Sequence, residues 1–304
     1  MKTVNFMGQR KLAILFSIVL MIVAIGSLAT RQLNWGLDFT GGTLVEVHYS
    51  ETADLTAIRQ TLETGGFAGA VVVSFGTDKD VLIRLPQGYS DKDGAQLLVR
   101  LQEAYSGEVE LRRIEFVGPQ VGDELREQGG LAMLLALGLV MLYIAFRFQF
   151  KFAVGAVVAL IHDVIVVLGF FSVIGMEFDL TVLAALLAVI GYSLNDTIVV
   201  SDRIRENFRK LRKADPEEVI NISLTETLGR TLVTSLTTML VLLALALFGG
   251  EMIHAFAIAL LVGVVIGTYS SIYVAANALL IMGVSKEDLM IPVKEGAEQE
   301  DLMP

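Results

Sequence analysis

Residues 180–200 read LTVLAALLAVIGYSLNDTIVV, an apolar run of helix-spanning length in which Asp196 is the only charged residue. At about 1.5 Å per residue, such a helix crosses the roughly 30 Å hydrocarbon layer of a membrane. Placing an ionised carboxylate there costs at least roughly 2.5 kcal/mol, so the group faces a wet cavity or a partner, or takes up a proton. Asp196 is therefore the first candidate functional residue.

The composition of the whole chain indicates a polytopic α-helical membrane protein. Hydrophobic residues are 54% of the 304 and charged residues only 18%, and the mean hydropathy is +0.65. Because the charges are segregated, charge-poor runs of spanning length stand out. They predict six transmembrane helices at residues 12–30, 129–146, 152–174, 180–200, 230–248 and 253–282.

Basic residues predict the orientation of these spans. Short segments rich in Lys and Arg stay in the cytoplasm. This rule assigns to the cytoplasm an N-terminus at 1–11, the turn with Arg147 and Lys151, and a loop at 201–229. With six spans both termini are then cytoplasmic, including a tail at 285–304, and residues 31–128 lie outside.

The first span also resembles a signal peptide, because Ser27 and Ala29 could form a cleavage site after a basic start. Its apolar region is long for a signal peptide, so we favour an uncleaved anchor. The absence of cysteine says little about compartment. A pI near 4.9 argues against a nucleic-acid partner, and the basic residues are expected to face membrane lipid instead.

The external segment reads as a compact α+β domain. Period-2 and helical patterns alternate in the order β-α-β-β-α-β between residues 43 and 117, which predicts a ferredoxin-like fold. Ser90 is the expected N-cap of the second helix. Such a fold names no function by itself.

Several polar residues interrupt the spans. We counted residues inward from the outer end of each run. Asp196 then lies about 24 Å below the outer surface, Arg230 about 27 Å and Asp163 about 18 Å. Asp163 could therefore lie one helical turn from Asp196. We therefore expect Asp196 and Arg230 to form a proton relay in which an ion pair alternates with a protonated, separated state. The candidate proton path is completed by four residues: Asp163, His162, Asn195 and Thr234.

Each of these residues also has a purely structural interpretation. Arg230 could be an interfacial anchor, His162 and Asp163 a satisfied polar pair, and the hydroxyls near Thr234 could bond to their own helix. Small-residue stripes end at Ser271 and at Asn195, and simple helix packing explains both. No metal site is expected because the histidines are scattered. The glycine-rich segment GLDFTGGT at 36–43 lacks the lysine of a P-loop.

Three segments together resemble a known family. They are GLDFTGGT at 36–43, IGYSLNDTIVVSDRIREN at 190–207 and LGRTLVTSLTT at 228–238. They are similar to the SecF branch of the SecD/SecF family of protein-export membrane subunits, in the resistance-nodulation-division superfamily. In that family the motif after the first span corresponds to Gly36, Asp38, Phe39, Gly41 and Gly42. Asp196 matches the proton-carrying aspartate, and Arg230 matches the arginine that accompanies it.

The resemblance implies an accessory subunit of Sec-dependent protein translocation, not an enzyme, in the bacterial inner membrane. It would be driven by the proton-motive force, with protons as the coupling ion and no other cofactor. Its implied partners are SecD, the SecYEG translocon, YajC and unfolded preproteins. Two alternatives remain open: a half-size exporter of small amphipathic molecules, and a structural subunit of the translocon that transports nothing.

Overall fold

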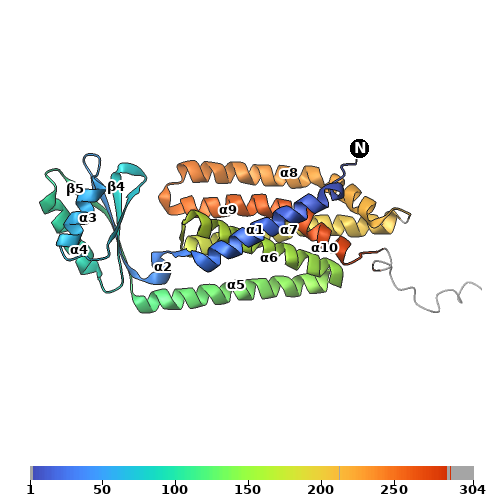
Figure 1. The fold of residues 1–304 in the computed structure, drawn as a ribbon, viewed down its shortest axis with the longest axis horizontal. Helices are drawn as coiled ribbons and strands as arrows, with labels where there is room; N and C mark the ends of the chain where they lie inside the picture. The colour runs from blue at the N-terminus through green and yellow to red at the C-terminus, as the bar shows by residue number, and fades with distance from the viewer. Residues whose placement is uncertain (1–2, 212, 286–287, 289–304) are drawn as a thin grey trace, which may run out of the picture.

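The computed structural model describes residues 3–211, 213–285 and 288. Figure 1 shows a bundle of long helices with a small α+β domain at one end, which we call the domain end; the opposite end is the far end. The predicted tail at 285–304 lies outside the described residues except for Ser285 and Asp288.

Six helices of the described chain are long and apolar enough to cross a membrane. They are α1 (Arg10–Thr30), α5 (Pro119–Arg147), α6 (Phe150–Ile174), α7 (Leu180–Lys210), α8 (Pro216–Phe248), and a sixth that starts as α9 (Glu251–Ser270). The sixth continues through a π-helical turn, η2 (Ser271–Ala275), into α10 (Ala276–Ile281). A short 3₁₀ helix, η1 (Met7–Gln9), precedes α1. The predicted six-helix membrane fold is confirmed.

Several helices extend beyond their predicted spans. The loop expected at 201–229 is mostly helix, because α7 runs on to Lys210 and α8 already begins at Pro216. Similarly, α5 begins at Pro119, ten residues before the predicted start of the span at 129. In both cases a helix continues beyond its apolar run, since charged residues are good helix formers once they reach water or headgroups.

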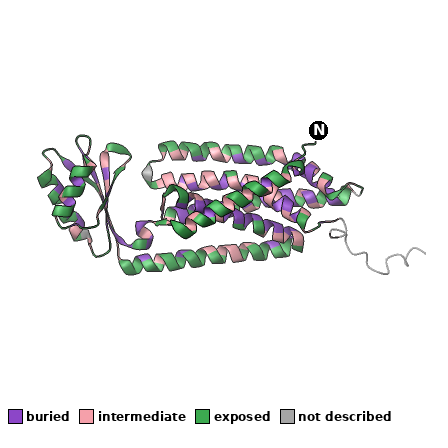
Figure 2. Ribbon diagram, in the orientation of Figure 1, coloured by how far each residue is buried: buried purple, intermediate pink, exposed green. Residues whose placement is uncertain are grey.

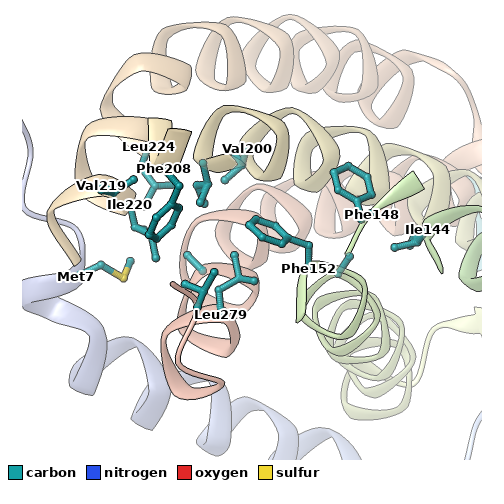
Figure 3. Packing of buried hydrophobic residues seen from close by; sticks show 14 residues of the cluster. Met7, Ile144, Phe148, Phe152, Val200, Phe208, Val219, Ile220, Leu224 and Leu279 are labelled. Atoms are coloured by element: carbon teal, nitrogen blue, oxygen red, sulfur yellow. The ribbon is translucent and has the colours of Figure 1, made fainter. Parts of the chain in front are cut away.

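The bundle has a central and a peripheral layer. In their most apolar stretches, 50% of α6 and 44% of α7 is buried, against 11% for α1 and for α5. Figure 2 shows the same contrast, with exposed residues covering much of α5 and α8. At the far end, buried side chains from five helices and η1 form one apolar cluster around Phe152, Phe208 and Met7 (Figure 3). The helices that carry Asp163 and Asp196 are thus the best-anchored pair.

The domain is the predicted ferredoxin-like sandwich. Its elements are β2 (Gly42–Tyr49), α3 (Leu55–Thr64), β3 (Val71–Phe75), β4 (Thr77–Leu85), α4 (Asp91–Ala104) and β5 (Val109–Val117). The sheet is antiparallel in the order β3-β4-β2-β5. Ser90 is the N-cap of α4, as predicted, and its backbone N–H donates to the Asp93 carboxylate at 2.6 Å.

A second, two-stranded sheet joins the domain end of the bundle to the chain that enters the domain. Strand β1 (Asn34–Trp35) pairs in parallel with β6 (Glu177–Phe178), which lies in the turn between α6 and α7. One turn of helix, α2 (Leu37–Thr40), then leads into β2. The glycine-rich motif therefore lies beside the start of α7.

We expect residues 42–118 to fold without the membrane. Every residue of the domain's buried core lies within 45–109, so no apolar contact from the bundle is needed to close it. The isolated segment should unfold cooperatively on heating and give a mixed α/β circular dichroism spectrum. A spectrum of disordered chain would contradict this.

The stability of the isolated segment at alkaline pH should depend on Tyr49. Burial raises the pKa of Tyr49 to about 12, with the charge of ionised Tyr105 as a lesser cause. Because the pKa of tyrosine in the unfolded chain is about 10, the neutral Tyr49 contributes to the free energy of unfolding in full below about pH 10. This contribution is lost as the pH rises through the folded-state pKa. Tyr49→Phe should remove that part of the alkaline loss of stability.

Candidate intramembrane proton site

Asp163, on α6, is fully buried, with no exposed surface, and is held from three sides. Its Oδ2 accepts hydrogen bonds from Ser193 Oγ of α7 at 2.5 Å and from Ser270 Oγ of α9 at 2.6 Å. Its Oδ1 lies 3.0 Å from Nδ1 of the preceding His162. A buried carboxyl group needs such donors, and here three helices supply them.

Asp196, on α7, is half-buried and is held from two other directions. Its Oδ1 accepts from Thr231 Oγ1 of α8 at 2.7 Å, and its Oδ2 accepts from Ser271 Oγ at 2.5 Å. No ion pair within 4.0 Å of Asp196 is found among the described residues. The carboxyl group is therefore bound by hydroxyl groups, which can both donate and accept.

The two carboxyl groups belong to one polar cluster. Ser270 binds Asp163 and the next residue, Ser271, binds Asp196. On α7, Ser193, which also binds Asp163, lies one helical turn before Asp196. Ser271 also begins the π-helical turn η2, and such turns are frequent at functional sites. The predicted closeness of Asp163 to Asp196 agrees with this arrangement.

Glycines let α7 and α9 approach closely enough to form the cluster. A Cβ atom on Gly267 would lie 3.1 Å from Ser193 Cβ, and one on Gly263 would overlap the Val189 side chain. The small-residue stripe that ends at Ser271 is thus a face for helix packing, which is how we interpreted it from the sequence.

His162 extends the cluster toward α1. Its side chain is almost fully buried, and its Nε2 has no hydrogen-bond partner among the described residues. The imidazole lies 6.2 Å from the Tyr269 ring, centroid to centroid. The Tyr269 hydroxyl donates to the Ala13 carbonyl at 2.7 Å and lies 2.9 Å from Ser17 Oγ.

Three predicted site residues make no hydrogen bond to this cluster among the described residues. Arg230, Asn195 and Thr234 are all exposed. Thr234 Oγ1 donates to the Arg230 carbonyl at 2.9 Å, so this hydroxyl bonds back to its own helix. In this structure, therefore, Asn195 and Thr234 do not line a path inside the described bundle, and Thr231, the residue after Arg230, makes the contact with Asp196.

Sequence reasoning missed two residues of the cluster, Ser193 and Ser270. Ser193 lies one helical turn before Asp196, so its hydroxyl could have been placed on the same face of the helix from the sequence alone. Ser270 precedes the last residue of the small-residue stripe and carries no local signal of its own.

The predicted motif residues Gly36, Asp38, Phe39, Gly41 and Gly42 lie at the domain end, away from the cluster. Asp38 Oδ2 accepts the backbone N–H of Leu180 at 3.0 Å, at the start of α7. Gly41 and Gly42 have φ of +67° and +129°, which favour glycine. The motif is therefore a structural junction rather than part of the carboxylate site.

Six membrane-crossing helices, a ferredoxin-like domain after the first of them and a carboxyl pair inside the bundle define a polytopic membrane protein of the transport type. Family models give the particular assignment: "Protein export membrane protein SecD/SecF, C-terminal" matches residues 98–285, and the "SecD/SecF GG Motif" matches residues 26–53. The chain belongs to the SecD/SecF family, which confirms the resemblance in the sequence.

Individual relatives agree with this assignment. The chain is 52% identical to the protein translocase subunit SecF of Vibrio alginolyticus, over 99% of this chain and 97% of the relative. Identity to the SecF subunit of Pseudomonas aeruginosa is 53%, over 95% of each chain.

Two solved structures share the fold. The chain is similar to SecDF of Thermus thermophilus, described as a translocon-associated membrane protein, with a TM-score of 0.84 and 39% identity. A second SecDF structure, in the super-membrane-facing form, matches with a TM-score of 0.70 and 40% identity. The chain covers 92% and 93% of its own length in these matches but spans only 39% of each SecDF chain.

Proposed function

We propose that this protein is an accessory subunit of Sec-dependent protein translocation, driven by the proton-motive force. Family membership and SecF relatives aligned over nearly the whole chain support the translocation role. The observation that carries proton coupling is Asp196, a carboxyl group in a membrane-crossing helix held by two hydroxyl groups. Gradient-dependent export in inverted membrane vesicles tests it, as described below.

Protonation of Asp196 would change its hydrogen bonds. An ionised carboxylate only accepts, so both Thr231 and Ser271 donate to it. A protonated carboxyl group also donates, so one of these hydroxyls must turn or move away. Thr231 lies on α8 and Ser271 at the π-helical turn after α9, so a hydroxyl that moves away on protonation would free α7 from one of these neighbours and let it repack.

The available energy suffices for a substantial movement. One proton crossing the membrane releases about 2.3 kcal/mol per 100 mV. Asp163 and His162 remain proposed members of the proton path, because they continue the polar cluster toward α1. Arg230 remains the proposed relay partner, in a second state in which its exposed side chain turns toward Asp196.

We further propose that SecD covers the exposed polar face. The small-residue stripe on α7, which ends at Asn195, is exposed along its length, at Ala184, Ala188, Gly191 and Asn195. Small residues let another helix approach closely, and lipid is a poor environment for Asn195 and Arg230. The SecDF structures support this partner, because their chains extend well beyond the part that this chain matches.

The remaining assignments belong to the same proposal. The protein lies in the bacterial inner membrane with both termini in the cytoplasm, and the ferredoxin-like domain faces the periplasm. There it acts with SecYEG and YajC on unfolded preproteins. The charge distribution across the helix ends supports this orientation.

Affinity purification in mild detergent should recover a second membrane protein with six spans and an external domain. The expectation follows from the exposed polar face, which would otherwise contact lipid. As a control, Ala188→Trp should reduce recovery of the partner by at least tenfold, whereas Leu131→Trp, on the exposed surface of α5, should not. Recovery of an active lone monomer would count against the partner assignment.

A further inference from the structure

We propose that Asp38 is a positioning residue that couples the movement of α7 to the external domain. The inference rests on the proposed function, since it concerns how a proton taken up at Asp196 would act on the domain. Its starting point is the hydrogen bond from the Leu180 N–H, the first residue of α7, to Asp38 Oδ2, at 3.0 Å.

The first step is that α7 is one continuous helix. It runs from Leu180 to Lys210 with Asp196 sixteen residues, or roughly 24 Å, from its start. A helix of this kind moves as a rod, so a shift at Asp196 reaches Leu180. There the helix has two carboxylates at its N-terminus, where backbone N–H groups lack partners within the helix.

Those two carboxylates have different attachments. Asp179 is the N-cap residue, and its Oδ1 accepts the Val182 N–H at 2.8 Å and the Thr181 hydroxyl at 2.7 Å, both in the same helix. Asp38 comes from a segment 142 residues away in sequence. Of these two carboxylates, Asp38 is therefore the one whose hydrogen bond links α7 to another part of the protein.

Asp38 is attached rigidly to the sheet. It lies in α2, and only Gly41 separates α2 from β2, which is an inner strand of the domain's sheet. Cβ atoms at Gly41 and Gly42 would press on the backbone of Pro119 and Leu85, so the junction is closely packed against the ends of neighbouring elements. There is no flexible linker between the helix start and the sheet.

Other contacts hold the same junction together. The Gly36 N–H donates to the Phe178 carbonyl at 2.9 Å, and the Phe39 and Phe178 rings lie 6.1 Å apart. Arg84 of β4 forms an ion pair with Glu177 of β6. These contacts fix the motif to the turn before α7. Phe39 packs in the same apolar cluster as Val182 and Leu183 of α7, and the Asp38 carboxylate adds a hydrogen bond to that helix.

The test uses electron–electron distance measurements on the full chain in its membrane complex. The chain has no cysteine, so spin labels can be placed at Glu63→Cys on α3 and Met252→Cys on α9, with partner cysteines replaced by serine. Asp196→Asn, a mimic of the protonated state, should shift the distance between domain and bundle. Adding Asp38→Ala should abolish that shift.

Two variants separate coupling from simple helix capping. Asp179→Ala removes a cap of the same helix and should leave the shift intact. Asp38→Asn keeps an oxygen that can accept the Leu180 N–H, and it should restore most of the shift while also showing that the site tolerates substitution.

The outcomes are distinguishable. A full shift in the Asp38→Ala chain would overturn the role of Asp38 while leaving proton coupling at Asp196 standing. Loss of the shift in Asp179→Ala as well would reduce Asp38 to a general cap and overturn the proposal. Absence of any shift on Asp196→Asn in the otherwise unchanged chain, with normal gradient-dependent export, would contradict both the proposed function and this inference.

Discussion

Replacing Asp196 with asparagine should reduce export in inverted vesicles to the level found without a proton gradient, at unchanged protein level and complex assembly. Asparagine is close to aspartic acid in shape, and its amide can still bond to Thr231 and Ser271. The side chain cannot, however, lose and regain a proton. The variant should therefore fold and assemble with its partner, remain in the arrangement of the protonated state, and be unable to cycle.

Asp202→Asn is the matched control for this prediction. Asp202 lies six residues further along the same helix, where its exposed carboxylate pairs with Arg147 and with the largely buried Arg205. Because asparagine keeps an oxygen to which both arginines can donate, and the Asp202 side chain is exposed, this variant should export normally. Full gradient-dependent export by Asp196→Asn would refute the relay and favour the structural-subunit alternative.

Replacing Asp163 with alanine should have the opposite signature, a large loss of stability. The substitution leaves the donors of Ser193, Ser270 and His162 without their acceptor inside the bundle. Unpaired buried donors and a vacated site together cost roughly 3 kcal/mol or more. The solubilised complex should denature at a clearly lower temperature, with reduced protein level in the membrane.

Asp196→Asn serves as the internal comparison, because it changes the other carboxyl group of the same cluster. Its thermal midpoint should stay close to that of the parent. An Asp163→Ala complex as stable as the parent would show that the hydroxyl groups find other partners, and the structural importance of Asp163 would be disproved.

Much of the fold can be predicted from the sequence because two strong patterns of apolar residues determine it. The six apolar runs identify the spans, and alternation between 43 and 117 predicts the β-α-β-β-α-β order that the sheet realises. Helix ends are less predictable, since hydropathy reports the apolar length of a helix and not its full length. The helical segments 201–210 and 216–229 were therefore expected as loop.

The site was predicted only in part, because depth along a helix can be counted but rotation about it cannot. Asn195 and Asp196 are adjacent, so they point about 100° apart, and only Asp196 reaches Thr231. The same ambiguity hid Thr231, the neighbour of Arg230, which makes the hydrogen bond to Asp196; the pairing of Arg230 with Asp196 stays a prediction. Ser193 and Ser270 were missed because a serine becomes significant only when the fold brings it to a carboxyl group.

Proton uptake by the reconstituted complex tests the central claim most directly. Proteoliposomes that contain this protein with its six-span partner would carry an internal pH-sensitive dye, and a potassium diffusion potential, negative inside, would drive protons inward. Complexes with Asp196 should acidify the interior, and complexes with Asp196→Asn should do so no faster than protein-free liposomes. Equal acidification by both complexes would contradict the assignment of Asp196 as the residue that carries the proton.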